Sequence, residues 1–459
     1  MMDAASPPTA SPQAAHIRVT SAQVFAIAGP AMVANLTTPL LGIVATIAIG
    51  RLGNATLLGG VAMASVIFDC MFWLFGFLRM GTVALTAQAT GARDTGEINA
   101  LLLRGFIIAG LIGLGLIAVQ IPLAAVVFDA MGGSASVTHA AHSYFTIRIW
   151  SAPMALANYV ALGWLVGQAR ASLALSVQIA INLVNMVATV VLVLVFDFGI
   201  AGAAIAAIIA ETSGLAIGIL IAQRTTRNAL VVSASALFDR AKLLRMFMVN
   251  RDIMIRTAAL ITAFLFFTAQ GARAGDVTLA ANAVLNNFLL ISAFFLDGLA
   301  NAAEQMCGRA VGAKDRGGFT GATRLVILWG FAFALAVTAV YALCGSHLID
   351  IMTASADVRL VARNYLWLVA LAPVLGVFAF AYDGIYIGAT WTRDMRNLMA
   401  LSLVIFLAAW WALRPFGNAG LWGALLVHYA ARGGLQGLRY PALLKRTFAA
   451  VTRPASPRP

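Results

Sequence analysis

The segment Gly91-Ala92-Arg93-Asp94 returns later in the chain as Gly312-Ala313-Lys314-Asp315 (312 − 91 = 221). Three more pairs follow in the same order, at offsets of 220, 221 and 218 residues: Ala152-Pro153 with Ala372-Pro373, Gly163-x-x-x-Gly167 with Gly384-x-x-x-Gly388, and Phe198-Gly199-x-Ala201-Gly202 with Phe416-Gly417-x-Ala419-Gly420. An offset that drifts by only three residues over four pairs indicates a duplicated unit. The sequence therefore predicts two similar halves.

The composition is that of a polytopic membrane protein. Hydrophobic residues make up 61% of the 459 residues and charged residues only 10%, whereas about a quarter of a soluble protein is charged. The N-terminal stretch 1–15 contains three prolines and no apolar core, so we do not expect it to be a cleavable signal. The three cysteines are odd in number and fall in apolar runs, which does not favour a disulfide framework.

Twelve segments are long and apolar enough to span a bilayer, which takes roughly 20 residues. They are residues 22–50, 56–82, 101–128, 142–168, 172–196, 199–223, 244–271, 277–306, 322–346, 361–391, 396–413 and 418–440. We therefore predict an all-α membrane protein with two six-helix lobes, related by a pseudo-two-fold axis along the membrane normal. The predicted parts are a cytoplasmic tail (1–20), an N-terminal lobe (21–224), a cytoplasmic linker (225–243), a C-terminal lobe (244–441) and a second cytoplasmic tail (442–459).

The distribution of arginine and lysine predicts the orientation. The even-numbered connections between spans and the C-terminal tail hold most of these residues, and cytoplasmic loops normally carry this excess. Both termini are therefore expected in the cytoplasm. The net charge of +13 gathers on one membrane face, where anionic lipid attracts it, so it predicts no nucleic-acid partner. We expect a monomer in the bilayer.

Few ionisable residues lie deep in the predicted spans, where burying a charge is costly and such residues usually serve a function. The ion-coupling candidates are Asp69, Glu211, Asp297 and Asp383. A carboxylate in an apolar medium binds protons more readily, as a proton-coupled exchanger requires. Asp297 and Asp383 each precede a glycine, so a role in capping a broken helix is an equal alternative. Glu304 is instead expected to be an interfacial charge paired with Arg309.

Polar residues in neighbouring spans are candidates for lining a substrate cavity: Asn35, Thr38, Asn158, Asn182, Asn185, Thr189, Asn286 and Asn287. Asn182 and Asn185 are three residues apart and share a helix face. Hydrogen bonding between helices is the alternative role for these residues, and polar side chains in membranes often serve it.

An enzyme is not indicated. The sequence contains no nucleophile elbow, phosphate loop or zinc-protease motif. The five histidines are scattered, and only the weak pair His139 and His142 has a spacing near that of metal ligands. No metal or cofactor is predicted apart from a coupling proton or sodium ion.

The chain resembles multidrug and toxic compound extrusion (MATE) transporters, in their DinF-like branch. The resemblance rests on four stretches: Pro39-Leu40-Leu41-Gly42-Ile43-Val44, Phe77-Leu78-Arg79-Met80-Gly81-Thr82, Asn250-Arg251-Asp252-Ile253-Met254, and Asp383-Gly384-x-x-x-Gly388-Ala389-Thr390. It implies twelve helices in two lobes around a central cleft that opens alternately to each side. It also implies a multi-pass inner-membrane protein that exports bulky, often cationic or amphipathic compounds and xenobiotics in exchange for protons or sodium.

The chain departs from the family pattern at two positions. Similar proteins carry an aspartate after the Gly-x-Val of the first span and another after the Asn-x-x-Asn of the fifth, and here these positions hold Ala45 and Thr189. Coupling would then rest on Asp69 and Glu211, or lie in the C-terminal lobe near Asp297 and Asp383, or be weak.

The leading hypothesis is an ion-coupled multidrug antiporter of the inner membrane, with protons expected rather than sodium. The alternative is a flippase for lipids or lipid-linked oligosaccharides, because proteins of related folds translocate such molecules. Such a cavity needs several cationic residues to hold a pyrophosphate, and the deep candidates are Arg79, Arg148 and Arg256. A membrane-embedded enzyme would instead need a histidine close to Asp69 and Glu211.

Overall fold

The computed structural model describes residues 19–226 and 231–449, apart from the side chain of Thr38. All regular elements in these ranges are helices. The first half contains α1 (Ser21–Gly50), α2 (Ala55–Leu74), α3 (Phe77–Gly91), α4 (Thr95–Ala118), α5 (Gln120–Met131), α6 (Ala135–Arg148), η1 (Ile149–Ser151), α7 (Ala152–Gly167), α8 (Ala171–Val190), η2 (Val191–Val195) and α9 (Gly199–Thr225). After the short α10 (Ala234–Leu237), the second half contains α11 (Arg240–Arg273), α12 (Asp276–Gly312), α13 (Arg316–Met352), α14 (Ala356–Gly388), α15 (Thr392–Leu413), η3 (Arg414–Phe416) and α16 (Gly417–Phe448).

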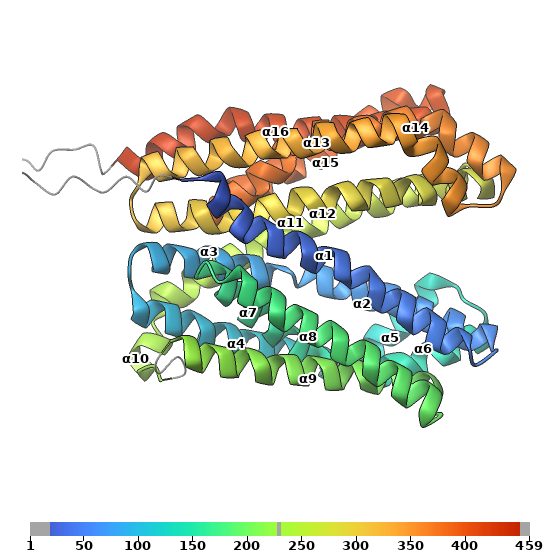
Figure 1. Cartoon of the computed structure of the whole chain (residues 1–459), viewed down its shortest axis with the longest axis horizontal. Helices are drawn as coiled ribbons and strands as arrows, with labels where there is room; N and C mark the ends of the chain where they lie inside the picture. Colours follow the sequence, from blue (N-terminus) through green and yellow to red (C-terminus); the bar gives the residue numbers. More distant parts are fainter. Residues whose placement is uncertain (1–18, 227–230, 450–459) are drawn as a thin grey trace, which may run out of the picture.

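The helices form two lobes, with α1–α9 in one and α11–α16 in the other (Figure 1). Within the described ranges, eleven helical stretches are long and apolar enough to cross a membrane, and the last, Thr392–Phe448, contains both α15 and α16. This agrees with the twelve predicted spans and confirms the fold class. The α10 helix and the start of α11 lie within the segment predicted as the linker.

Three predicted spans are interrupted in the structure. The span predicted at 56–82 is two helices that meet at Phe75-Gly76 and continue to Gly91. The span predicted at 101–128 begins earlier, at Thr95, and breaks at Val119. The span predicted at 142–168 is interrupted by η1, because Pro153 has no N–H and its ring excludes the carbonyl four residues before it.

The duplicated Gly-Ala-Arg/Lys-Asp motif is a helix end followed directly by a helix start. Arg93 and Lys314 both have a positive φ, of 57° and 55°, which ends α3 and α12. The aspartate that follows each of them caps the next helix: Asp94 Oδ1 accepts from Glu97 N at 2.9 Å, and Asp315 Oδ1 accepts from Gly318 N at 2.9 Å. The same four-residue sequence therefore builds the same turn in both lobes.

The repeated Gly-x-x-x-Gly motifs have equivalent packing roles. In the first lobe, a Cβ on Gly163 would lie only 2.6 Å from the carbonyl oxygen of Arg79, so only glycine lets α7 approach α3 this closely. In the second lobe, Gly384 and Gly388 of α14 lie equally close to the carbonyl groups of Ala300 and Glu304 of α12. Because Arg79 and Ala300 are also 221 residues apart (300 − 79), the two interfaces are copies of one another.

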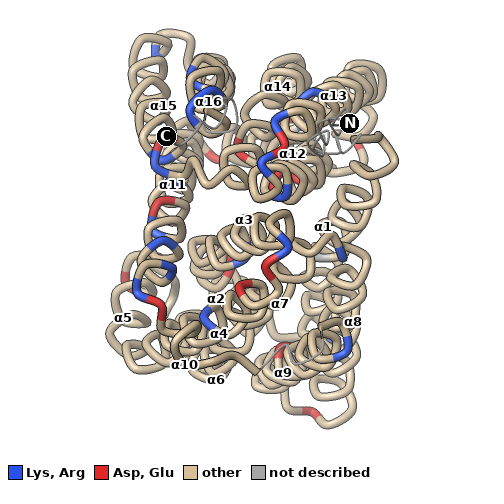
Figure 2. The backbone as a smooth tube through the Cα atoms, turned by 90° about the vertical axis from the view of Figure 1, so that its left-hand side faces the viewer, with Lys and Arg blue, Asp and Glu red and all other residues tan. Residues whose placement is uncertain are grey.

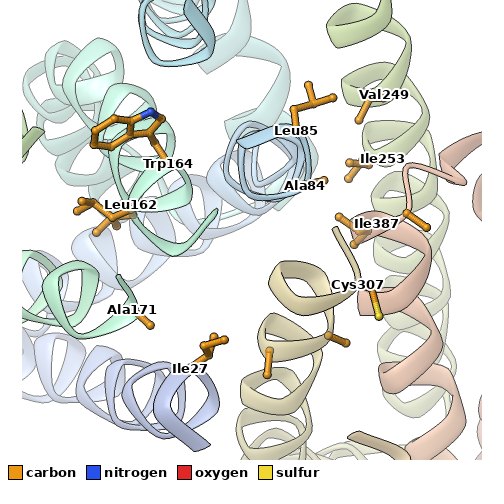
Figure 3. Packing of buried hydrophobic residues seen from close by; sticks show 14 of the residues in the cluster. Ile27, Ala84, Leu85, Leu162, Trp164, Ala171, Val249, Ile253, Cys307 and Ile387 are labelled. Carbon is orange, nitrogen blue, oxygen red and sulfur yellow. The ribbon is translucent and has the colours of Figure 1, made fainter. Parts of the chain in front are cut away.

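The two lobes share one apolar core near the end where the termini lie. Figure 3 shows part of it, with Leu85 of α3 near Val249 of α11, Ala84 of α3 near Ile253 of α11, and Cys307 of α12 close to Ile387 of α14. Gln88 of α3 also donates from Nε2 to the carbonyl oxygen of Gly388, at 2.9 Å. Towards the opposite end each lobe has a core of its own. The lobes are thus joined at one end of the molecule.

Figure 2 looks onto the joined end, where many lysine and arginine positions of α11, α12, α13 and α16 lie, coloured blue. Trp329 of α13 holds the start of α1 there by donating from Nε1 to Ser21 Oγ at 3.1 Å. The first turn of α1 is thereby placed against the C-terminal lobe.

Candidate functional site

A cavity of about 390 Å³ lies within the first lobe, between α1, α2, α3, α6, α7, α8 and α9, and Asn301 of α12 also lines it. It brings together six residues that the sequence analysis selected from five different helices: Asn35, Asp69, Asn158, Asn182, Asn185 and Glu211. The remaining polar lining comes from Arg79, Arg148, Ser151, Tyr159, Gln178 and Asn301. The walls between these groups are mainly aliphatic, so the cavity suits an amphipathic molecule.

Glu211 is held in this cavity by Asn158. Asn158 Nδ2 donates to Glu211 Oε2 at 2.7 Å and to the backbone carbonyl of Glu211 at 2.8 Å. Small residues allow α9 to approach α7 and α8 here, since a Cβ on Gly214 would overlap the side chain of Ile181. The carboxylate therefore has a fixed position and one side-chain amide as its neutral partner.

Asp69 of α2 faces open space in the cavity, and its side chain is exposed there. The positive charge of Arg148 of α6 lies near enough to act on the carboxylate of Asp69. The two side chains nevertheless form no ion pair among those described. Arg148 is oriented by aromatic residues instead. Its guanidinium carbon lies 4.6 Å from the centre of the Phe68 ring, and Nη1 donates to the hydroxyl of Tyr144 at 3.0 Å. Its Nε has no hydrogen-bond partner.

Arg79 reaches the cavity from the first turn of α3, just after the break between α2 and α3. It forms no side-chain hydrogen bond or ion pair with the described residues. The cavity therefore contains two carboxylates and two guanidinium groups that do not neutralise one another by direct contact. The sequence analysis considered Arg79 and Arg148 only as phosphate ligands, and their position in the middle of apolar spans was the available signal.

Some of the predicted lining residues bond other helices. Asn182 of α8 donates from Nδ2 to Thr37 Oγ1 of α1 at 3.0 Å and accepts from Gln178 at 3.0 Å. Thr189 is buried, does not line the cavity, and donates to Asn185 Oδ1 at 3.3 Å. Asn35 lines the cavity and also donates to the carbonyl oxygen of Phe294 in α12, at 3.4 Å. The side chain of Thr38 lies outside the described part of the structure.

The two positions that lack the family's aspartates lie beyond this cavity. Ala45 is half-buried near the end of α1, and Thr189 is buried near the end of α8, which packs against α1. Neither lines the space that Asp69 and Glu211 share. The acids of this chain therefore occupy other helices and another depth than the family pattern implies.

The candidates of the C-terminal lobe do not form one site with those of the N-terminal lobe. Asp383 is buried and accepts hydrogen bonds from Arg256, from Arg432 Nη2 at 2.5 Å and from Gln436 Nε2 at 2.9 Å. Its contacts are those of an internal ion-pair cluster that links α11, α14 and α16, not of a helix cap. Arg256 is consequently committed to Asp383.

The other C-terminal candidates are dispersed along α12. Asp297 has an exposed side chain, while Asn286 is half-buried and Asn287 donates to the carbonyl oxygen of its own helix at Ala283, at 3.0 Å. None of the three lines the cavity.

The interpretation of Glu304 as an interfacial charge paired with Arg309 was wrong. Glu304 is only 3% exposed, and its Oε2 has no hydrogen-bond partner. A separation of five residues turns the two side chains away from each other on a helix, whereas partners stand three or four residues apart. Among the described residues, no group of three or more His, Cys, Asp and Glu side chains is arranged to hold a metal.

Comparison with known proteins identifies the fold and the family. The MatE family model matches residues 30–191 and 252–410, two segments whose starts lie 222 residues apart (252 − 30). The chain belongs to the MatE family. The predicted resemblance to MATE transporters is thereby confirmed, and the spacing of the two matches agrees with the internal repeat. As a MatE protein it is a multi-pass membrane transporter and not an enzyme.

Several relatives cover most of this MatE protein. DNA damage-inducible protein F of Escherichia coli is 36% identical over 409 residues, which are 89% of each chain. A probable multidrug resistance protein NorM of Caulobacter vibrioides is 27% identical, over 88% of this chain and 87% of the relative.

Solved structures share its fold. A multidrug resistance MATE family transporter of the MOP superfamily, in an outward-facing conformation, superposes with a TM-score of 0.82 at 18% identity, over 92% of this chain and 96% of the other. A mutant of the Vibrio cholerae MATE transporter VcmN gives a TM-score of 0.83 at 21% identity, over 93% and 97%.

Proposed function

We propose that this protein is a proton-coupled multidrug antiporter that exports bulky cationic or amphipathic compounds across the inner membrane of a bacterium. The observation that carries the proposal is the joint placement of Asp69 and Glu211 in one cavity of the N-terminal lobe. Carboxylates at such a depth are costly unless they bind a cation or a proton. The names of the relatives, which include a probable multidrug resistance protein, support the substrate class.

Competition between substrate and proton gives the exchange its mechanism. A cationic group of the substrate binds beside the ionised carboxylates, and protonation of the same oxygens removes that attraction. The substrate is then released on the side where protons are abundant. The proton and the substrate bind the same carboxylates. Each of them shifts the equilibrium between the two conformations of the lobes only if it binds one conformation more tightly than the other.

Alternating access of two lobes supplies the transport step. The lobes are joined at the end that carries both termini and have separate cores at the other end. We place the joined end at the cytoplasm, because lysine and arginine side chains gather there (Figure 2). The described conformation is then closed to the cytoplasm, and export requires the shared core to separate. The cavity lies within one chain, which supports a monomer as the working unit.

Protons suit this cavity better than sodium. Glu211 Oε2 already receives an N–H from Asn158, and an amide donor repels a cation at the same oxygen. Arg148 lies near Asp69 and further disfavours a bound sodium ion. A proton needs one carboxylate oxygen, whereas a metal cation needs several oxygen ligands at once.

The cavity supports the flippase alternative less well. Of the three arginines considered for holding a pyrophosphate, Arg256 is bound to Asp383, and only Arg79 and Arg148 line the cavity. Two carboxylates share that space and repel a group of several negative charges. The antiporter therefore remains the function that the geometry supports.

Transport by the purified protein in sealed vesicles tests the proposal. A cationic dye is loaded, and proton and sodium gradients are imposed separately. We expect efflux with the proton gradient, and a loss of about tenfold or more in Asp69→Asn and Glu211→Gln, since a 1.4 kcal/mol change in binding is tenfold. Asp350→Asn is the matched control, because Asp350 pairs with Arg363 far from the cavity. Transport driven by sodium alone, or unchanged in both variants, would overturn the proposal.

A further inference from the structure

The charged groups of the N-terminal cavity are of both signs and equal in number. Of its lining residues, Asp69 and Glu211 carry negative charge, and Arg79 and Arg148 carry positive charge. Each comes from a different helix: α2, α9, α3 and α6, respectively. A cavity built for a simple cation would need only the two acids. The presence of two arginines therefore calls for an explanation.

Direct pairing between these groups does not explain the arginines. No ion pair joins any two of the four, all of which the structure describes. The C-terminal lobe shows the contrast, because there Arg256 and Arg432 both close onto Asp383. An arginine keeps its charge at any physiological pH, so the two arginines of the cavity remain positive without a direct ion pair, even though carboxylates lie near them.

Arg148 has a fixed orientation but lacks an anionic hydrogen-bond partner. It is stacked over Phe68 and bonded to the neutral hydroxyl of Tyr144, and its buried Nε has no partner. Arg79 of α3 is half-buried and makes no side-chain hydrogen bond or ion pair to the described residues, although it lies near enough to Asp297 and Glu304 of α12 to act on their charges. Leaving such donors unpaired in an apolar environment is costly, so a ligand that supplies an acceptor would gain a charge-assisted hydrogen bond.

We propose that the preferred substrates carry both charges: an amphipathic zwitterion whose cationic group binds at Asp69 and Glu211 and whose carboxylate or similar anionic group binds at Arg148 and Arg79. This deepens the proposed function and rests on it. Protonation of the two acids releases the cationic end, as in the antiport cycle, while the arginines select among substrates. The aliphatic walls of the cavity contact the apolar part of the substrate that lies between its two charged groups.

Three xanthene dyes of similar size separate the contributions of the two charges. Rhodamine 110 has a cationic ring system and a carboxylate, its methyl ester rhodamine 123 keeps only the cation, and fluorescein is anionic. Binding is measured by fluorescence polarisation with the full-length protein in detergent, without zwitterionic lipid that could compete. We expect rhodamine 110 to bind about tenfold more tightly than rhodamine 123, or about 1.4 kcal/mol, and fluorescein to bind weakest.

Substitutions then locate the preference. Arg148→Gln should remove the advantage of rhodamine 110 and leave the affinity for rhodamine 123 unchanged or higher, whereas Asp69→Asn should weaken both. Arg414→Gln is the matched control, since Arg414 also stacks on an aromatic ring, at 5.4 Å from the centre of Trp410, but lies outside the cavity. If Arg148→Gln does not fold, Arg79→Gln takes its place.

Equal or weaker binding of rhodamine 110 by the wild-type protein would overturn the inference, as would an equal loss for all three dyes in Arg148→Gln. The proposed antiport is judged separately, by the vesicle assay with rhodamine 123. Proton-driven efflux of rhodamine 123 without a preference for the zwitterion would contradict only the inference about zwitterionic substrates. A preference for the zwitterion in binding without proton-driven efflux would contradict only the proposed antiport.

Discussion

Gly91 and Gly312 each pack against the helix that carries the other. A Cβ on Gly91 would overlap the carbonyl oxygen of Arg309, and a Cβ on Gly312 would overlap that of Gln88. Gln88 and Arg309 are themselves separated by the repeat offset (309 − 88 = 221), so the contact is symmetric about the axis that relates the two lobes. The motif that revealed the duplication is therefore also the place where its two copies meet.

In the alternating-access cycle proposed above, this contact would open when the lobes exchange conformations. We predict that Gly91→Ala and Gly312→Ala favour the separated state, because an added methyl group meets backbone atoms that cannot turn away, at a cost of about 1–3 kcal/mol. Cys307 reports the change, since it is buried in the shared core (Figure 3). In a Cys70→Ser, Cys344→Ser background, we expect its alkylation by a water-soluble maleimide to be about tenfold faster.

Gly110→Ala controls for the loss of a helical glycine, because open space surrounds that position. A rate equal to that of the unaltered background in both Gly91→Ala and Gly312→Ala would contradict this account of the closed end.

A close glycine contact within one lobe, in contrast, should affect the stability of the folded protein and not the separation of the lobes. Gly384 packs on the backbone of Ala300, and these residues remain together in both conformations if each lobe moves as a unit. We predict that Gly384→Ala lowers the free energy of unfolding by about 1–3 kcal/mol and leaves Cys307 as unreactive as before. Thermal unfolding in detergent measures the loss of stability. Gly115→Ala is the control, because open space surrounds Gly115. A normal melting temperature would mean that the backbone of α12 yields easily.

The repeat and the apolar spans were sufficient to predict the two lobes, because covalent spacing and hydrophobicity act locally. The breaks within spans were less accessible to sequence reasoning. The break at Phe75-Gly76 contains no proline and lies just before Arg79, whose carbonyl oxygen packs against Gly163 of α7. Glu304 was misjudged for a related reason. Arg309 follows it closely in the chain, yet Glu304 is buried, and its backbone carbonyl packs against Gly388 of α14.

The linker between the lobes is held by a buried arginine. Arg104 of α4 is 1% exposed and donates to Glu97 Oε1 at 2.8 Å, to the carbonyl oxygen of Leu237 at 2.9 Å and to that of Ala236. Glu97 also pairs with Lys242 of α11, at 2.7 Å. This network fixes α10 and the first turn of α11 against the N-terminal lobe.

We predict that Arg104→Gln releases the linker without unfolding the lobes. Losing hydrogen bonds to a charged donor costs about 1.5–3 kcal/mol each, so amide hydrogen exchange in residues 233–243 should become at least tenfold faster. Arg224→Gln, at the exposed end of α9, is the control, since Arg224 makes no side-chain bond to the described residues. Exchange that stays slow in Arg104→Gln would show that apolar contacts of α10 suffice.

About half of the polar residues of the candidate site could be selected from the sequence, but their grouping could not. Six of the polar residues selected from the spans do share one cavity, because polar groups in a membrane protein are kept away from lipid. Sequence alone could not show that Asp383 lies against Arg256 and Arg432, which are 127 and 49 residues away along the chain. It also could not show which arginines remain without a direct ion pair.

Asp383 provides the sharpest distinction between a coupling role and a structural one. It was a candidate for binding the coupling ion, yet it neutralises Arg256 and Arg432 in a buried cluster. Removing one partner of such a cluster leaves an uncompensated charge and costs about 3–5 kcal/mol. We therefore predict that Asp383→Asn lowers the melting temperature and the yield of folded protein, while the molecules that fold still couple dye efflux to protons.

The companion variant Asp383→Asn, Arg256→Met removes one charge of each sign and should restore part of the lost stability, since an apolar residue of similar length replaces the unpaired guanidinium. Melting temperature and proton-driven efflux are measured on the same preparations. A normally stable Asp383→Asn protein that has lost proton-driven efflux would reverse the conclusion and place a coupling site in the C-terminal lobe. Asp69 and Glu211 would then have to act as substrate ligands alone.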